Sequence, residues 1–222
     1  MRITWYGQSA FHLETAEGSA FIDPFGVFQK DARPSMQFDY PAIPRLAVDL
    51  LLITHEHFDH NGKEALEEPK ALVRSTAGRF KTPLGEVTAV ASEHDPVAGT
   101  QRGPNSIFVF TLGGLRVCHL GDFGQSGLRP EQRDAIGEVD LLFVPVGGGP
   151  TIGAAGAHEV ARALSAKVLV PMHYRTPAVN FLETADAFLA SCANTVHVAA
   201  AFDTKDLPSS RPICAVPAVP VG

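Results

Sequence analysis

The sequence predicts an α+β fold in which two β-sheets lie face to face and helices cover their outer faces. Three observations support this prediction. The first half of the chain is rich in strand-like patterns, whereas the second half alternates between helix and strand. Several strand-like segments are continuously apolar, as expected for strands that are buried on both faces. Gly113-Gly114 separates two such segments and predicts a two-residue hairpin turn.

Strands dominate the first half of the chain. Apolar runs and alternations predict strands at 3–6, 10–14, 20–23, 48–54, 71–74, 86–92, 106–112 and 115–120, with a short helix at 63–68. The segment 25–47 contains three prolines and is expected to form a long loop. Its aromatic residues, expected to be exposed, are Phe28, Phe38 and Tyr40. Because a long loop in a compact domain is commonly functional, we expect this segment to border a substrate cleft.

Helices and strands alternate in the second half. Helices are expected around 131–137, 158–165 and 181–192, and strands at 140–146, 167–172 and 195–199. The last residues, 208–222, contain four prolines and no periodicity, so little regular structure is expected there. We therefore expect one domain over residues 1–207, followed by a Pro-rich C-terminal tail over 208–222.

Composition excludes several classes of protein. The net charge of −6 argues against a general nucleic-acid-binding protein, which commonly has a basic face. No apolar run reaches the roughly 18 residues that a membrane-spanning helix needs. The three cysteines are widely spaced and form no CxxC pair. A reducing cytoplasm is the natural interpretation, with Cys118 and Cys192 as small apolar packing residues.

The most informative motif follows the apolar strand at 48–54. Four potential metal ligands lie within six residues there: His55, His57, Asp59 and His60. Imidazole and carboxylate ligands together suit zinc, and also manganese or iron. The carboxyl end of such a strand is also where open α/β sheets place their active sites. A solvated loop that is rich in histidine is the alternative, and the rarity of this pattern makes it the weaker one.

Other candidate ligands also follow expected strands. His94 follows the strand at 86–92, Asp122 follows the strand at 115–120, and His173 follows the strand at 167–172. Any one of them taken alone is a weak signal, because a single histidine is more often structural than a ligand. If the carboxyl ends of these strands meet at one edge of the sheets, all the candidates would gather in one place.

These residues resemble the metallo-β-lactamase superfamily. The ordered set H-x-H-x-D-H, His, Gly-Asp and His is similar to the ligand pattern of that superfamily, which has a four-layer αββα sandwich and a metal site at one edge of its two sheets. The similarity covers about residues 1–200 and is closest to the compact branch of ascorbate-6-phosphate lactonases and Zn-dependent hydrolases. The flanking motifs that carry it are Gly7-Gln8-Ser9, Ile22-Asp23-Pro24, Arg102-Gly103-Pro104-Asn105, His119-Leu120-Gly121-Asp122, Pro145-Val146-Gly147-Gly148 and Pro171-Met172-His173-Tyr174.

The resemblance implies two divalent metal ions, each held by three side chains, with one carboxylate shared between them. The first set is His55, His57 and His94, the second set is Asp59, His60 and His173, and the shared carboxylate is Asp122. Zinc is the expected metal, with manganese or iron as alternatives. The implied activity is hydrolysis of a small cytoplasmic ester, lactone or phosphodiester by a metal-bound hydroxide, which Asp59 would orient.

Further residues have less specific signals. His119 is a candidate proton donor or a supporting residue next to the metal ligands. Asp95 could orient a ligand histidine or cap a turn. Arg102 and Arg175 could hold a carboxylate or phosphate of the substrate, with surface salt bridges as the alternative. A separate group of histidines is expected to be structural: His12, His158 and His197.

Two other functions remain open at this stage. Di-iron oxygen-handling proteins share the fold, but they resemble H-x-E-x-D-H, with a carboxylate where this chain has His57. A binding protein that lost catalysis is the other alternative, and the full ligand set argues against it. RNA-processing relatives carry a large inserted domain for which this chain has no room. We expect a small-molecule substrate and no partnership with nucleic acid or membrane, and leave a homo-oligomer open.

Overall fold

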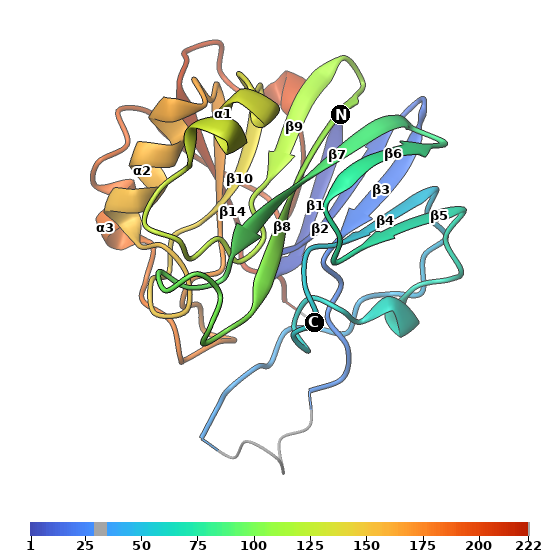
Figure 1. Cartoon of the computed structure of the whole chain (residues 1–222), viewed down its shortest axis with the longest axis horizontal. Coiled ribbons are helices and arrows are strands. Elements are labelled where there is room, and N and C mark those ends of the chain that lie inside the picture. Colours follow the sequence, from blue (N-terminus) through green and yellow to red (C-terminus); the bar gives the residue numbers. More distant parts are fainter. Residues whose placement is uncertain (29–34, 222) are drawn as a thin grey trace.

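The computed structural model describes residues 1–28 and 35–221 and contains two β-sheets packed face to face (Figure 1). The expectations for 25–47 and 208–222 therefore lie partly outside the described residues. The first sheet has six strands in the order β13-β1-β2-β3-β4-β5. These strands are β1 (Arg2–Gly7), β2 (Ala10–Thr15), β3 (Gly18–Ile22), β4 (Leu50–Ile53), β5 (Ala71–Arg74) and β13 (Ala201–Asp203). The predicted α+β sandwich of two sheets is confirmed.

The second sheet has eight strands in the order β12-β14-β11-β10-β9-β8-β7-β6. They are β6 (Gly78–Thr82), β7 (Gly85–Glu93), β8 (Pro104–Leu112), β9 (Leu115–His119), β10 (Leu141–Pro145), β11 (Val168–Met172), β12 (Thr195–Val198) and β14 (Ile213–Pro217). β8 and β9 form the predicted hairpin, with Gly113 and Gly114 at φ of 55° and 76°, as a tight hairpin turn requires. From β9 to β12 the neighbouring strands run parallel.

The core lies between the sheets, and β4 shows why its sequence is continuously apolar. Leu50 and Leu52 face the core between the sheets, whereas Leu51 and Ile53 belong to a second apolar cluster on the outer face of the first sheet. All four side chains are completely buried. Neither face of β4 contacts solvent. Apolar residues are therefore favoured at every position, and the usual alternation of apolar and polar residues is absent.

Helices cover only one of the two outer faces in the described part of the chain. α1 (Pro130–Ile136), α2 (Ala154–Ala163) and α3 (Asp186–Leu189) lie on the outer side of the second sheet (Figure 1). The helix expected at 63–68 is a shorter 3-10 turn, η2 (Lys63–Ala65), and the one expected at 181–192 is reduced to α3. No helix within the described residues is long and apolar enough to cross a membrane.

The described part of the segment 25–47 covers the outer face of the first sheet instead. Phe38 and Tyr40 are buried in the outer cluster, and Phe28 is partly buried, so the expectation of exposed aromatics is wrong. These rings belong to the same apolar cluster as the outward-facing side chains Leu51 and Ile53, and the cluster shields this face of the sheet from water. A loop without regular structure therefore takes the place of a helical layer.

The expectation of little regular structure in 208–222 is also wrong. β14 lies between β11 and β12, and its side chains from Ile213 to Val216 are buried. The apolar run Ile-Cys-Ala-Val is short and is flanked by prolines, so the sequence pattern does not indicate a strand there. Pro217 ends the strand, where the missing N–H costs no ladder hydrogen bond. β6 and β13 were not expected from the sequence either.

Candidate metal centre

The expected ligands meet at one edge of the sandwich. The loop after β4 supplies four of them, and the loops after β7, β9 and β11 supply one each. The structure groups them into three overlapping sets whose ligand atoms lie within 4.8 Å of one another. The sets are His55, His57 and His94; His55, His60 and Asp122; and Asp59, His60 and His173. These side chains can therefore hold metal ions, as the sequence predicts.

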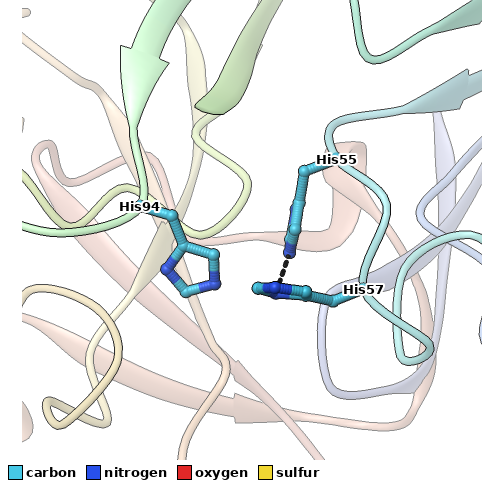
Figure 2. A group of neighbouring side chains, drawn as sticks. All are labelled: His55, His57 and His94. Carbon is cyan, nitrogen blue, oxygen red and sulfur yellow. Dashed lines mark hydrogen bonds between the residues drawn. The ribbon is translucent and has the colours of Figure 1, made fainter. Parts of the chain in front are cut away.

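The first set consists of three imidazoles. His55 Nε2 lies 3.0 Å from His57 Nδ1, and the ring of His94 approaches both from the opposite side, with centroids 4.9 Å away (Figure 2). His55 and His94 are buried, whereas His57 is partly exposed. Three nitrogen ligands with one accessible side suit a tetrahedral metal ion that keeps an open position.

The second set places a carboxylate between two imidazoles. Asp59 Oδ2 lies 3.6 Å from His60 Nε2 and 4.0 Å from His173 Nε2. All three side chains are buried. The backbone of His173 has a φ of 51°, a left-handed conformation that non-glycine residues adopt rarely and that is often found at functional sites.

Asp122 lies between the two sets. Its Oδ2 is 3.0 Å from His94 Nε2 and 3.1 Å from His173 Nε2, while its Oδ1 is 3.2 Å from His60 Nε2. His55 Nε2 is 3.8 Å from Oδ2. One carboxylate thus faces imidazoles from both sets, which is the placement expected of a bridging ligand.

The polypeptide before Asp122 fixes this position. The amide N–H of Asp122 donates to Asn105 Oδ1 at 3.0 Å, and Asn105 Nδ2 donates to the carbonyl of Leu120 at 2.8 Å. Gly121 has a φ of 56°, and a Cβ at this position would collide with Asn105 and Thr54. Glycine is therefore required for the backbone to turn and present the carboxylate.

Two buried atoms at the centre of the site are well placed for a cation. His60 Nε2 and Asp122 Oδ1 have no hydrogen-bond partner among the described residues, although they face each other. Leaving such atoms buried without a partner costs free energy, so a ligand is expected to satisfy them. The donor set of imidazoles and carboxylates fits a divalent metal ion.

Three of the candidate ligand imidazoles have their outward-facing nitrogens held by acceptors. His60 Nδ1 donates to Asp23 Oδ2 at 2.9 Å, and His94 Nδ1 donates to the carbonyl of Pro150 at 2.9 Å. His55 Nδ1 lies 3.0 Å from the Thr54 hydroxyl, which donates to Asp23 Oδ2 at 2.7 Å. Because the Nδ1 protons of these three histidines point outward, their Nε2 atoms are the ones directed at the metal site.

Asp23 and Gln8 were part of recognised motifs, but the sequence assigned them no role. Asp23 is fully buried and supports two ligand histidines, one directly and one through Thr54. Gln8, also fully buried, donates from Nε2 to Asp59 Oδ2 at 2.9 Å. Both have a positive φ, 49° for Asp23 and 51° for Gln8. A polar residue beside a glycine or proline where an expected strand ends is the sequence signal that could have identified them.

Removing the Asp23 carboxylate is expected to weaken metal binding about 10–100-fold, as for other residues that orient metal ligands. In the wild type, Oδ2 accepts from His60 Nδ1 and the Thr54 hydroxyl, and Oδ1 accepts from the Thr54 N–H at 2.7 Å. In Asp23→Asn, one of these oxygens becomes an NH₂ group that cannot accept a hydrogen bond. Competition titration with a chromophoric chelator measures the change. Asp49→Asn is the matched control, because Asp49 also accepts a backbone N–H but contacts Lys70 rather than a histidine. Equal metal affinities in the two variants would contradict this role.

Electrostatics in the site follow from burial and from Asp122. Burial alone would raise the pKa of Asp122, but attraction to His173 and His60 outweighs it and holds this pKa well below its usual value. Burial lowers the pKa of His55 well below its ordinary range, which keeps that imidazole neutral as a ligand must be. For His60, nearby carboxylates outweigh burial and raise the pKa, Asp122 first among them.

His119 does not fit the expected role of proton donor. It is fully buried, its Nε2 donates to the carbonyl of Ser9 at 3.1 Å, and its Nδ1 accepts from the N–H of Gly121 at 3.1 Å. Burial lowers the pKa of His119, which favours the neutral ring that these two bonds require. Both ring nitrogens bind backbone, so this geometry favours a positioning role next to the turn that presents Asp122.

Asp95 caps a turn rather than orienting a histidine. Its two oxygens accept from four backbone N–H groups, those of Val97, Gly99, Gln101 and Arg102, at 2.8–3.0 Å. Desolvation raises its pKa, but the four backbone donors together outweigh this and lower it below the usual value. This carboxylate shapes the loop that follows His94.

The structure places both candidate substrate-binding arginines at the surface. Arg102 is exposed, and its backbone N–H binds Asp95. Arg175 is exposed too, and its Nε donates to the carbonyl of Leu182 at 2.6 Å. Each lies next to a loop that carries a ligand, because Arg102 follows the His94 loop and Arg175 is two residues after His173.

The segment 25–47 lies beside the ligand loop, on the side of Phe58. The ring of Phe58 contacts Phe28 and Phe38, with centroids 5.3 and 5.7 Å away. The Tyr40 hydroxyl hydrogen-bonds Thr176 in the loop after His173. The described part of this segment thus connects two of the loops that carry ligands.

Comparison with known proteins places the chain in a family. A family model described as the β-lactamase superfamily domain matches residues 2–173. A UPF0173 protein of Pyrococcus abyssi is 31% identical over 198 residues, which cover 79% of this chain and 84% of that protein. A protein named UPF0173 metal-dependent hydrolase, from Desulforamulus reducens, is 28% identical over 203 residues, covering 79% and 85% of the two chains.

A solved structure agrees. A Thermotoga maritima protein, described as a candidate Zn-dependent hydrolase of the metallo-β-lactamase superfamily, is 31% identical with a TM-score of 0.75, covering 97% of this chain and 98% of that one. The superfamily resemblance found in the sequence is confirmed. This chain belongs to the metallo-β-lactamase superfamily and, within it, to the UPF0173 family.

Proposed function

We propose that this protein is a metal-dependent hydrolase that holds two divalent metal ions and acts on a small ester, lactone or phosphodiester. The observation that carries the proposal is the meeting of six candidate ligand side chains around a seventh, Asp122. Two buried atoms at the centre have no hydrogen-bond partner among the described residues. The relatives support it, since one bears the name metal-dependent hydrolase and another is described as a candidate Zn-dependent hydrolase.

The two sets of side chains would each hold one ion. His55, His57 and His94 would hold the first, Asp59, His60 and His173 the second, and Asp122 would contact both. Zinc is favoured because imidazole predominates in the set, and manganese or iron suit the same ligands. We propose two ions because the candidate ligands form two sets, one on each side of the Asp122 carboxylate.

Bound divalent ions would supply Lewis acidity, which makes coordinated water acidic and polarises a carbonyl or phosphoryl oxygen. The chain's own residues would accept the proton and orient the substrate. Gln8 holds Oδ2 of Asp59, which leaves the carboxylate in one orientation toward the site, where it can accept a proton. His57 is the most accessible ligand, so the substrate would approach on its side. Arg102 and Arg175 would bind an anionic group of the substrate.

The substrate is proposed to be a small cytoplasmic molecule. The net charge of −6 favours neither nucleic acid nor an anionic membrane as a partner. Cytoplasmic location and assembly into a homo-oligomer remain predictions from the sequence.

Elemental analysis of protein purified without chelators should find about two divalent ions per chain, as expected for this ligand set. Protein loaded separately with zinc, manganese or iron is then assayed against lactones, phosphodiesters, thioesters and β-lactams. We expect hydrolysis of one of these classes to persist with redox-silent zinc. His197→Ala is the control, since His197 is exposed on β12, outside the ligand sets.

A different outcome would favour the oxygen-handling alternative. Turnover that requires both iron and oxygen, and that vanishes in zinc-only protein, would overturn the hydrolase proposal while leaving the family assignment intact. Metal-free protein that is fully active on any substrate of the panel would overturn the metal requirement itself.

A further inference from the structure

Two cysteines line a cavity that the proposed hydrolysis does not use. Cys192, just beyond α3, and Cys214, in β14, both border a cavity of about 470 Å³. The same cavity is lined by three cationic side chains, Arg162, Lys167 and Arg211. Carboxylates are not among the described residues that line it.

This cavity lies at the opposite end of the parallel strands from the metal ligands. Leu169, in β11, pairs with Cys214 and borders the cavity, whereas His173 follows the other end of the same strand. Four residues of extended strand separate the two positions, which corresponds to about 13 Å. The thiols are therefore not metal ligands of the site described above.

The backbone holds the two cysteines next to each other. The N–H of Cys214 donates to the carbonyl of Asn194 at 2.8 Å, and Asn194 Nδ2 donates to the carbonyl of Pro212 at 3.2 Å. Asn194 is two residues from Cys192, so these bonds fix the turn that carries Cys192 against the start of β14. Both side chains border the same cavity, and each thiol influences the pKa of the other, as expected for neighbouring groups.

The two thiols have different environments. Cys192 is partly exposed, and its Sγ lies 3.5 Å from the carbonyl of Phe188; Cys214 is buried. The neighbouring Cys214 thiol lowers the pKa of Cys192, whereas the Cys192 thiol, together with burial, raises the pKa of Cys214. Cys118 is buried in the core, where desolvation raises its pKa.

We propose that Cys192 and Cys214 form a redox-active dithiol site that hydroperoxides oxidise to a disulfide. An accessible thiolate next to a second thiol is the arrangement found in peroxide-sensing cysteines. Cys192, which the sequence suggested to be a packing residue, is the attacking group, and Cys214 is the resolving group.

The reaction balances with one hydroperoxide. The Cys192 thiolate attacks one peroxide oxygen, the O–O bond breaks, and the leaving oxygen departs as water or an alcohol after taking up a proton. The resulting sulfenic acid on Cys192 is attacked by the sulfur of Cys214, which forms the S–S bond and releases the hydroxyl as water. Two thiols are oxidised by two electrons, and the peroxide is reduced.

Hydrogen peroxide treatment of the full-length, tris(carboxyethyl)phosphine-reduced protein tests the proposal. After denaturation, the number of titratable thiols should fall from three to one. Peptide mapping should find Cys192 joined to Cys214, with Cys118 still reduced. In Cys214→Ala, dimedone should trap a sulfenic acid on Cys192, because the resolving thiol is missing.

Cys118→Ala is the matched control and should still form the cross-link. Wild-type protein alone suffices for the mapping, so a variant that fails to fold leaves the test intact. Three thiols remaining after peroxide treatment, or oxidation that reaches Cys118 as readily as Cys192, would overturn the proposal. Joining of Cys192 to a cysteine of a second chain instead of Cys214 would overturn it as well.

Discussion

Replacing His57 and Asp122 together with alanine is expected to remove nearly all bound metal and to lower any hydrolytic activity by about 10³-fold or more. His57 belongs to the first ligand set, and Asp122 faces imidazoles of both sets at 3.0–3.2 Å. Without the carboxylate, the remaining imidazoles would have to accept two dications with less compensating negative charge. Elemental analysis after dialysis measures the metal content.

A matched double variant controls for the loss of one histidine and one aspartate. His197→Ala with Asp186→Ala removes the same two residue types from exposed positions and should retain the metal ions. Circular dichroism checks that both variants are folded. Metal content that survives unchanged in the His57 and Asp122 variant would show that the ions are bound elsewhere.

Asp59→Asn is expected to lower the turnover rate by about 10²–10⁴-fold, the usual contribution of a positioned general base. The amide keeps nearly the same shape, but it cannot take up a proton, and the Nε2 group of Gln8 no longer meets a charged acceptor. Because three imidazoles and Asp122 remain around the first ion, a large part of the metal should stay bound. Turnover and metal content are measured on the same preparation.

The control here is Asp186→Asn, a substitution of the same kind at an exposed position on α3. If Asp59→Asn loses activity only in proportion to lost metal, Asp59 is a ligand alone and has no part in proton transfer. Full activity with both ions bound would exclude Asp59 from the chemistry altogether.

Much of the fold could be predicted because its signals are local. The strands that became β4, β8 and β11 are apolar runs, and their burial depends on side chains within the run itself. β14 was missed because its apolar residues lie between prolines, and only its position between β11 and β12 makes it a strand. The aromatic residues of 25–47 were expected at the surface, because the sequence of a loop does not indicate which face of a sheet the loop will cover.

In the metal site, too, the features with a local sequence signal could be predicted and those that depend on tertiary contacts could not. The candidate ligands could be recognised from the sequence because each follows an expected strand, and strand ends are marked by local patterns. Their supporting residues could not. Asp23 reaches His60 across 37 positions, and Gln8 reaches Asp59 across 51.

By itself, the sequence indicated the candidate ligands, the two-sheet class and most of the strands, because strand ends and apolar periodicity are short-range properties. The tertiary structure alone decided that Asp122 lies between both sets, that the ring of His119 is held by backbone on both sides, and that Cys192 lies against Cys214. Apart from the local bond between Gly121 and His119, these contacts join segments that are distant in the sequence, and their geometry depends on the register of many strands at once.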